Sequence, residues 1–214
     1  MKKYILITLF ALTFSWNNFG QTSSQQDSYQ QNITAPRDTC DNPDANIECY
    51  FLNMPETLES TMLIPYKNET AKELIITGKI FKSDGKTPFP NVILYAYHTD
   101  SRGYYSKKGN ETGIQKWHGY LHGWCKTDST GNYTIKTIRP APYPNASIPA
   151  HIHAAIKKPD NSLLHINDYM FTDDQLVTES YNSSLTNYTG GSGIIELKKV
   201  NDTWFGQRDI KLED

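Results

Sequence analysis

The chain has 214 residues, and 21 lysines and arginines nearly balance 23 aspartates and glutamates, so the formal net charge is −2. The sequence contains no Lys/Arg-rich block that could hold a phosphate backbone, which argues against nucleic-acid binding and against an anionic membrane surface as partner. The length is typical of one soluble domain with a tail. Aromatic residues make up 12% of the chain, and 14 of them are tyrosines.

The first twenty residues have the pattern of a secretory signal peptide. Lys2 and Lys3 precede an apolar run that ends at Phe14, and polar residues and the small Gly20 follow. The apolar run is shorter than the roughly 20 residues that a membrane-spanning helix needs, and no later segment approaches that length. We therefore predict a signal peptide over residues 1–20, secretion to an extracellular or periplasmic location, and no membrane span. The alternative is a buried helix.

Three cysteines follow this segment. Cys40 and Cys49 lie nine positions apart, a spacing that a loop can close with a disulfide in an exported protein. The spacing leaves open whether they are bonded. Cys125 is left over, and a lone cysteine beside Trp124 is more typical of a buried, inert thiol than of a nucleophile.

The rest of the chain predicts an all-β domain. Residues 21–38 are rich in Gln and Ser and predict a flexible leader, so the domain is expected over residues 39–214. Apolar residues recur with period two in four later segments, 74–81, 91–99, 131–138 and 151–156. Prolines between positions 88 and 149 exclude a long helix through the middle. The expected fold is an antiparallel β-sandwich with little helix apart from the signal peptide, a short helix within 172–185 and a closing hairpin formed by 191–200 and 203–212.

Two histidines in the last of these strands are the first candidates for chemistry. His151 and His153 are two positions apart, so in a strand their side chains point to the same face, while Ile152 points to the other. Two imidazoles on one face suggest a metal site, and the alternative is a pair of solvated or core histidines. A further ligand is needed to decide between them, and no Asp or Glu has HxD or HxE spacing with this pair.

Tyrosines supply the nearest further candidates. Tyr143 stands between two prolines, eight residues before His151, and a residue before proline is held in an extended conformation. Tyr104 and Tyr105 follow the strand at 91–99. A phenolate is a hard anionic oxygen donor, so two of them with two imidazoles would favour ferric iron over zinc. The alternative for any one tyrosine is an ordinary packing role.

In order and spacing, these segments resemble the intradiol ring-cleavage dioxygenase family, in the manner of catechol 1,2-dioxygenase and protocatechuate 3,4-dioxygenase. The resemblance runs from about Leu74 to Leu176. It is strongest in TDSTGNYTIKTIRPAPYP followed by PAHIHAAI, and an upstream match lies in GKIFKSDGKTPFPNVILYAYHTDSRGYYS. The secreted branch of the family fits the predicted signal peptide.

The resemblance implies a ligand set and a reaction. It places the metal ligands at Tyr105, the G-x-Y position, and at Tyr143, His151 and His153, with Fe(3+) as the cofactor. It also implies that a catechol-type aromatic substrate binds the iron, that Tyr143 leaves the metal and takes a substrate proton as the catalytic base, and that O2 opens the ring between the two hydroxylated carbons without an external reductant.

Three positions differ from the family pattern. Ile148 stands where family members carry an Arg that stabilises charge on the substrate, and Asp168 lies near the position of a Gln. Tyr95 or Tyr97 replaces a strand Trp. Loss of the Arg removes a fixed positive charge from the site, a contribution often worth several kcal/mol of barrier.

Two other functions therefore remain open. One is a non-catalytic secreted β-sandwich binding module of the transthyretin or carboxypeptidase-regulatory type, and the other is a binder of ferric iron or of a catechol siderophore. For the assembly we expect a monomer or a small homo-oligomer.

Overall fold

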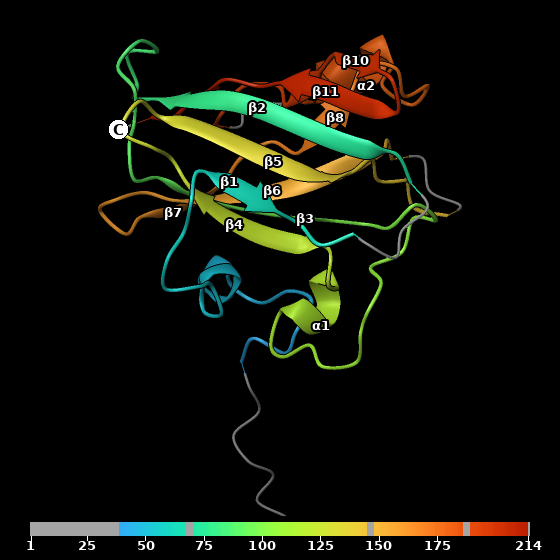
Figure 1. Cartoon of the computed structure of the whole chain (residues 1–214), viewed down its shortest axis with the longest axis horizontal. Coiled ribbons are helices and arrows are strands. Elements are labelled where there is room, and N and C mark those ends of the chain that lie inside the picture. The colour runs from blue at the N-terminus through green and yellow to red at the C-terminus, as the bar shows by residue number, and fades with distance from the viewer. Residues whose placement is uncertain (1–38, 67–70, 145–147, 186–188, 214) are drawn as a thin grey trace, which may run out of the picture. The chain divides into compact units, whose positions relative to one another are not determined.

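The computed structural model describes residues 39–66, 71–144, 148–185 and 189–213 (Figure 1). The predicted signal peptide and leader, residues 1–38, lie outside the described residues. The described chain forms two six-stranded sheets with three short helical segments. Within this part of the chain, no helix has the length and apolar character needed to cross a membrane.

The first sheet is built around a long antiparallel pair, β2 and β5, in which Glu73 lies opposite Ile138 and Lys79 opposite Asn132. β1 and β11 flank this pair through parallel pairing, and β10 joins β11 as the closing antiparallel hairpin that the sequence predicted. β12 pairs with the end of β2. The strands of this sheet are β1 (Thr61–Leu63), β2 (Glu73–Phe81), β5 (Asn132–Ile138), β10 (Leu197–Val200), β11 (Thr203–Gln207) and β12 (Ile210–Lys211).

The second sheet has β3 and β6 at its centre, again as an antiparallel pair. β4 pairs with the other edge of β3, and β7 and β8 both pair with β6. β9 closes the order through a parallel pair with β8. The strands are β3 (Ile93–His98), β4 (His122–Lys126), β6 (His151–Lys157), β7 (Leu163–His165), β8 (Tyr169–Phe171) and β9 (Ile194–Ile195).

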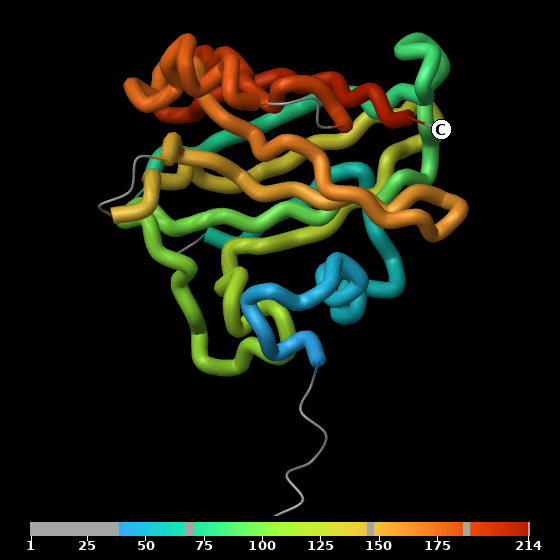
Figure 2. Tube along the Cα trace, turned by 180° about the vertical axis from the view of Figure 1, so that it is seen from behind, coloured from blue at the N-terminus to red at the C-terminus, as the bar shows by residue number. Residues whose placement is uncertain are grey.

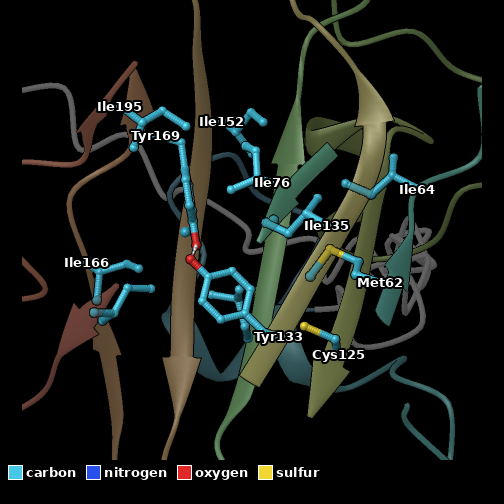
Figure 3. Close-up of a cluster of buried hydrophobic side chains, with 14 of the residues drawn as sticks. Met62, Ile64, Ile76, Cys125, Tyr133, Ile135, Ile152, Ile166, Tyr169 and Ile195 are labelled. Atoms are coloured by element: carbon cyan, nitrogen blue, oxygen red, sulfur yellow. Dashed lines mark hydrogen bonds between the residues drawn. The ribbon is translucent and has the colours of Figure 1, made fainter. Parts of the chain in front are cut away.

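The two sheets pack face to face around an apolar layer, the inter-sheet core. Alternate residues of β2, β5 and β6 point into it, among them Ile76, Ile135 and Ile152, all fully buried (Figure 3). Two phenols, of Tyr133 and Tyr169, meet inside this layer through a hydrogen bond of 3.0 Å. Period-two alternation therefore directs one face of each central strand inward, as the sequence predicted.

The outer face of the second sheet is covered as well. The 3₁₀ helix η1 (Ile47–Phe51) packs on it, and Phe51 forms a second apolar cluster there with Tyr95 and Ala155. α1 (Gln115–His118) lies on the same side, away from the first sheet (Figure 1). A disulfide between Cys40 and Cys49 ties η1 to the segment before it.

The loop after β3 and the segment from residue 39 to 60 lie side by side on this outer face (Figure 2). The Asn53 amide donates to Gln115 Oε1 at 2.9 Å, and Lys116 pairs with Asp41 at 2.5 Å. These contacts, with the disulfide, hold a cover over β3 and β6 that the strand pattern alone did not predict.

The β-sandwich prediction is confirmed, and its antiparallel centre with it. The sheets are mixed, because β1, β9, β11 and β12 join by parallel pairing at or near the edges. The expected short helix is α2 (Glu179–Ser184), whose first turn is capped by the Thr178 hydroxyl accepting from the Tyr181 backbone N–H at 3.1 Å. Cys125 is fully buried, and burial raises the pKa of its thiol to about 12, as expected for an inert cysteine.

Candidate metal centre

β6 places both histidines on the outer face of the second sheet. His151 Nδ1 lies 2.6 Å from the carbonyl oxygen of Pro149, and His153 Nδ1 lies 3.0 Å from Asp168 Oδ2. Both partners only accept hydrogen bonds, so both Nδ1 atoms carry the proton and donate. The Nε2 atom of each ring is left with its lone pair, which is the state that ligates a metal.

Tyr143 approaches from the loop between β5 and β6. Its phenol oxygen lies 3.2 Å from His151 Nε2 and 3.1 Å from His153 Nε2. The preceding segment is tied to the end of β3, because the Thr99 hydroxyl donates to the Ala141 carbonyl at 2.7 Å and the Ala141 N–H donates to the Asp100 carbonyl. These hydrogen bonds to the end of β3 hold the loop in a position from which Tyr143 points toward the two histidines.

Tyr105 comes from the loop after β3, and its phenol oxygen lies 2.9 Å from His153 Nε2. It also hydrogen-bonds the Tyr143 phenol. Tyr104, by contrast, is 57% exposed. The structure therefore brings together the four residues predicted as ligands and places Tyr105, not Tyr104, among them. We refer to Tyr105, Tyr143, His151 and His153 as the donor cluster.

Asp100 organises the loop that carries Tyr105. Its fully buried carboxylate accepts from the Arg102 guanidinium at 2.7 Å, from the Ser106 hydroxyl at 2.6 Å and from the backbone N–H of Arg102 and Tyr104. Burial alone would raise its pKa, but these hydrogen bonds hold the pKa at about 2. Gly103, at φ +86°, lets this loop approach the Tyr143 loop, because a Cβ there would meet the Pro142 carbonyl.

The donor cluster does not contain enough protons to form a hydrogen bond at each of its close contacts. Five contacts at hydrogen-bonding distance join its four donor atoms, including a 3.0 Å contact between the two Nε2 atoms. With both Nε2 atoms unprotonated, the two phenol protons can serve only two of these contacts. A metal ion at the centre would satisfy all four atoms at once.

The spacing of the donor atoms also fits a metal. Ligand atoms about 2.0–2.1 Å from a first-row ion, seen from it at about 90–110°, lie about 2.8–3.4 Å from one another. The four contacts that involve the imidazole nitrogens measure 2.9, 3.0, 3.1 and 3.2 Å. The residues present therefore fit a metal ion held by two imidazoles and two phenol oxygens.

Burial sets the protonation of the donor cluster when no cation is bound. It raises the pKa of the Tyr143 and Tyr105 phenols above the ordinary value of 10.0, and the mutual hydrogen bond adds to the rise at Tyr105. It lowers the pKa of His151 below the ordinary 6.5. The phenols are thus neutral near pH 7 without a metal, and binding as phenolates must release two protons.

Asp168 lies close enough to the two histidines to be considered a third metal-binding residue with them. Its carboxylate, however, contacts His153 at Nδ1, on the opposite side of the ring from the donor cluster. It therefore orients the imidazole and fixes its tautomer. The HxH pattern gave no sign of this residue, because it lies 15 positions further along the chain and reaches His153 only through the fold.

An aromatic stack supports His153 from the neighbouring strand. Tyr97 lies directly opposite His153 in the β3–β6 register, and their rings stack with centroids 4.6 Å apart. The other face of Tyr97 stacks on His118 of α1 at 3.5 Å, and His118 Nδ1 lies 2.9 Å from the Tyr95 phenol. Burial lowers the pKa of His118 to about 3, so this ring is a neutral packing group. Sequence reasoning named Tyr95 and Tyr97 only as replacements of a Trp and missed His118.

A cavity of about 280 Å³ borders the donor cluster at His153. Its wall also includes Asp168, Tyr97 and the α2 residue Tyr181. Ile148, at the position of the expected Arg, is 43% exposed and is not part of this wall. The described residues of the cavity wall therefore include a carboxylate and tyrosines but no Lys or Arg, and the wall lies beside the candidate metal centre at His153.

The outward Tyr2His2 cluster on a β-sandwich is a candidate metal centre, and comparison with known proteins names the family. The family model described as "Dioxygenase" matches residues 48–210. The chain belongs to this dioxygenase family.

Two curated relatives are similar over parts of the chain. Catechol 1,2-dioxygenase of Acinetobacter baylyi is 32% identical over 94 residues, which cover 44% of this chain and 29% of that protein. Chlorocatechol 1,2-dioxygenase of Pseudomonas putida is 28% identical over 125 residues, 51% of this chain and 46% of that protein. The chain thus spans less than half the length of each.

Solved structures show the same fold. The dioxygenase domain of a dioxygenase–carbohydrate-binding fusion from the cellulolytic bacterium Streptomyces sp. SirexAA-E has a TM-score of 0.55 at 20% identity, covering 71% of this chain and 86% of that one. Catechol 1,2-dioxygenase from Pseudomonas arvilla C-1 has a TM-score of 0.55 at 17% identity, covering 72% and 56%.

Proposed function

We propose that this protein is a secreted ferric dioxygenase that opens the ring of a catechol-type substrate between its two hydroxylated carbons with O2. The observation that carries the proposal is the convergence of two phenol oxygens and two imidazole Nε2 atoms within hydrogen-bonding distance. Two hard anionic oxygens favour a trivalent ion and keep it ferric. A bound ferric ion would supply a Lewis acid that a catechol would chelate and that would activate the catechol toward O2.

The protein's own residues have distinct tasks in this reaction. His151 and His153 are neutral nitrogen ligands, oriented by the Pro149 carbonyl and by Asp168. Tyr105 is the more firmly placed oxygen ligand, because the Asp100 carboxylate holds its loop through four different groups. A fixed set of ligands lowers the cost of reorganisation when substrate binds.

Tyr143 is assigned the role of proton acceptor at its phenol oxygen. Its burial raises the pKa of the phenol, so its phenolate, once released from a metal, is a strong base toward a catechol hydroxyl. Two neighbours within 3.2 Å, His151 Nε2 and His153 Nε2, hold this oxygen within the donor cluster. These contacts support the family role of the residue in this chain.

The disulfide supports the proposal that the protein works outside the cytoplasm. A bond between Cys40 and Cys49 persists in oxidising compartments and is rare where thiols are kept reduced. The N-terminal pattern, in which Lys2 and Lys3 precede an apolar run, also supports a location outside the cytoplasm. We propose a monomer or small homo-oligomer for the assembly, with the catechol and O2 as the partners of the site.

A visible absorption spectrum and an oxygen electrode test this function. Protein loaded with ferric iron is expected to be burgundy red from phenolate-to-iron charge transfer, to change colour with catechol under nitrogen, and to consume one O2 per catechol under air. Mass spectrometry should find a ring-opened diacid. Protein that stays colourless after loading would contradict the proposal and would favour the non-catalytic binding module.

A second function is favoured by the electrostatics of the site. Ile148 leaves the position of the family Arg without positive charge, and none of the described residues that line the cavity at His153 is Lys or Arg. A site with this deficiency could hold ferric iron or a ferric–catechol complex without opening the ring. A red protein that binds catechol but consumes no oxygen would establish this function in place of the first.

A further inference from the structure

The cavity at His153 has a carboxylate in its wall and, among the described residues that line it, no Lys or Arg. Its volume of about 280 Å³ can take a short substituent on a ring, and His153 is the member of the donor cluster in its wall. The wall residues are Tyr50, Tyr97, His153, Ala154, His165, Ile166, Asn167, Asp168, Met170, Tyr181 and Leu185. Among these lining residues, Asp168 is the one acidic side chain, and there is no Lys or Arg.

Asp168 presents a carboxylate to this space. Its Oδ2 accepts from His153 Nδ1, and a third of its side chain, 33%, is exposed. His165 does not offset the charge, because burial lowers the pKa of His165 below the ordinary 6.5. A carboxylate with no Lys or Arg among the described residues of the same wall attracts a cationic group and repels an anionic one.

Two tyrosines of the wall, Tyr50 and Tyr181, offer rings to a cation, whereas both faces of the third, Tyr97, are covered by His153 and His118. Tyr50, Tyr97 and Tyr181 come from η1, β3 and α2, three elements that are far apart in the sequence. An ammonium group near aromatic rings gains about 0.5–2 kcal/mol from their negative faces, more when it is desolvated. A carboxylate among aromatic rings is the arrangement that recognises an amine.

We propose that the Asp168 cavity selects catechols that carry a cationic amine on a short side chain. The inference rests on the proposed function, since the catechol oxygens must be held at the donor cluster for the side chain to enter the cavity. The same wall discriminates against a carboxylate-bearing catechol, because Asp168 would face a like charge and the position of Ile148 offers no compensating cation.

Three catechols of similar size test the inference: one with a 4-(2-aminoethyl) group, one with a 4-propyl group and one with a 4-carboxymethyl group. Dissociation constants are measured under nitrogen from the change in the visible band of the iron-loaded protein and from intrinsic fluorescence of the metal-free protein. kcat/KM is measured by oxygen uptake. We expect about tenfold preference for the amine over the propyl compound and weaker binding still for the carboxylate.

Two variants and one control assign the preference to its residues. Asp168→Asn removes the charge, and the ratio of amine to propyl binding should fall close to one, whatever happens to the absolute rate. Tyr181→Leu removes one ring on α2 without touching His153, and the ratio should fall about threefold. Asp202→Asn removes the same charge from an 83%-exposed side chain at the β10–β11 turn and should leave the ratio unchanged.

The outcomes separate this inference from the function on which it rests. A protein that binds no ferric iron overturns both. A red protein that opens all three catechols with equal kcat/KM, or that prefers the carboxylate, overturns the amine selectivity alone. An amine preference that survives Asp168→Asn also overturns it, because the charge of Asp168 is its stated cause.

Discussion

The two faces of β6 differ completely in chemistry although they alternate residue by residue. Ile152 and Ile156 point into the inter-sheet core and are fully buried among other apolar side chains. His151 and His153 point outward to two tyrosines delivered by separate loops. The inward face needs only apolar residues of suitable volume, whereas the outward face needs particular atoms at particular distances. One face of a strand can thus tolerate substitution by other apolar residues, while the other face depends on particular side chains.

Substituting neighbouring residues of β6 should separate the two faces most strongly. Ile152→Ala removes buried methyl groups and leaves a cavity, so we expect the free energy of unfolding to fall by about 2–5 kcal/mol, while any folded protein still binds iron. His153→Ala should abolish the visible band and change stability of the metal-free protein far less. Urea unfolding and the visible spectrum measure the two quantities. An equal loss of stability in the two variants would contradict the division of β6 into a face that stabilises the fold and a face that binds the metal.

A pair of tyrosines gives the next contrast. Tyr143→Phe removes a donor atom and the proposed base, so turnover should fall about 10²–10⁴-fold and the visible band should shift. Tyr133→Phe leaves the Arg208 carbonyl and the Tyr169 hydroxyl without their buried partner, which should cost about 1–3 kcal/mol of stability with the colour unchanged. An unchanged spectrum in Tyr143→Phe would remove this tyrosine from the metal.

The buried His98, on the inter-sheet side of β3, predicts that the free energy of unfolding depends on pH. Its Nδ1 donates to the Thr99 carbonyl and its Nε2 lies 2.6 Å from the Thr137 hydroxyl, and burial lowers its pKa to about 4. The unfolded chain takes up this proton at about pH 6.5, the folded protein only at about pH 4. The free energy of unfolding should therefore fall as the pH falls from about 6.5 toward 4, by at most about 1.4 kcal/mol per pH unit, and be unaffected by His98 above that range.

The variant His98→Gln isolates this contribution, because other buried histidines also titrate. Urea unfolding of metal-free protein at about pH 7 and about pH 5 should show the wild type losing about 2 kcal/mol more than the variant. Parallel losses in the two proteins would show that His98 is not kept neutral by the fold.

The smallest expected effect is at Asp100, which acts on the donor cluster only through the Tyr105 loop. Asp100→Asn weakens the contacts with Arg102 and Ser106, so we expect iron affinity to fall about tenfold and the visible band to broaden. Asp202→Asn, an exposed carboxylate paired with Lys72, is the matched control and should change neither. Iron affinity is measured by competition with a chelator. Unchanged affinity in Asp100→Asn would mean that Tyr105 is held without this carboxylate.

The strands and the shared face of the histidines could be predicted because both follow from local rules. Period-two patterns located β2, β3, β5 and β6, and the HxH spacing placed two imidazoles on one side of β6. Four strands of the described chain were missed. The inward residues of β4 are Gly123 and Cys125, so it lacks a pattern of large apolar residues. β1, β7 and β8 have three residues each, too few to show a period, and they form because longer neighbours offer hydrogen-bonding edges.

By itself the sequence predicted the β-sandwich, the four residues of the donor cluster and, through its resemblance to a family, the roles proposed for them. The tertiary structure decided that Tyr105 turns inward while Tyr104 stays exposed, that Asp168 reaches the outer nitrogen of His153, and that Tyr97 stacks beneath it. These contacts join loops and strands from distant parts of the chain. Their geometry depends on strand register and loop packing, which no local pattern of residues encodes.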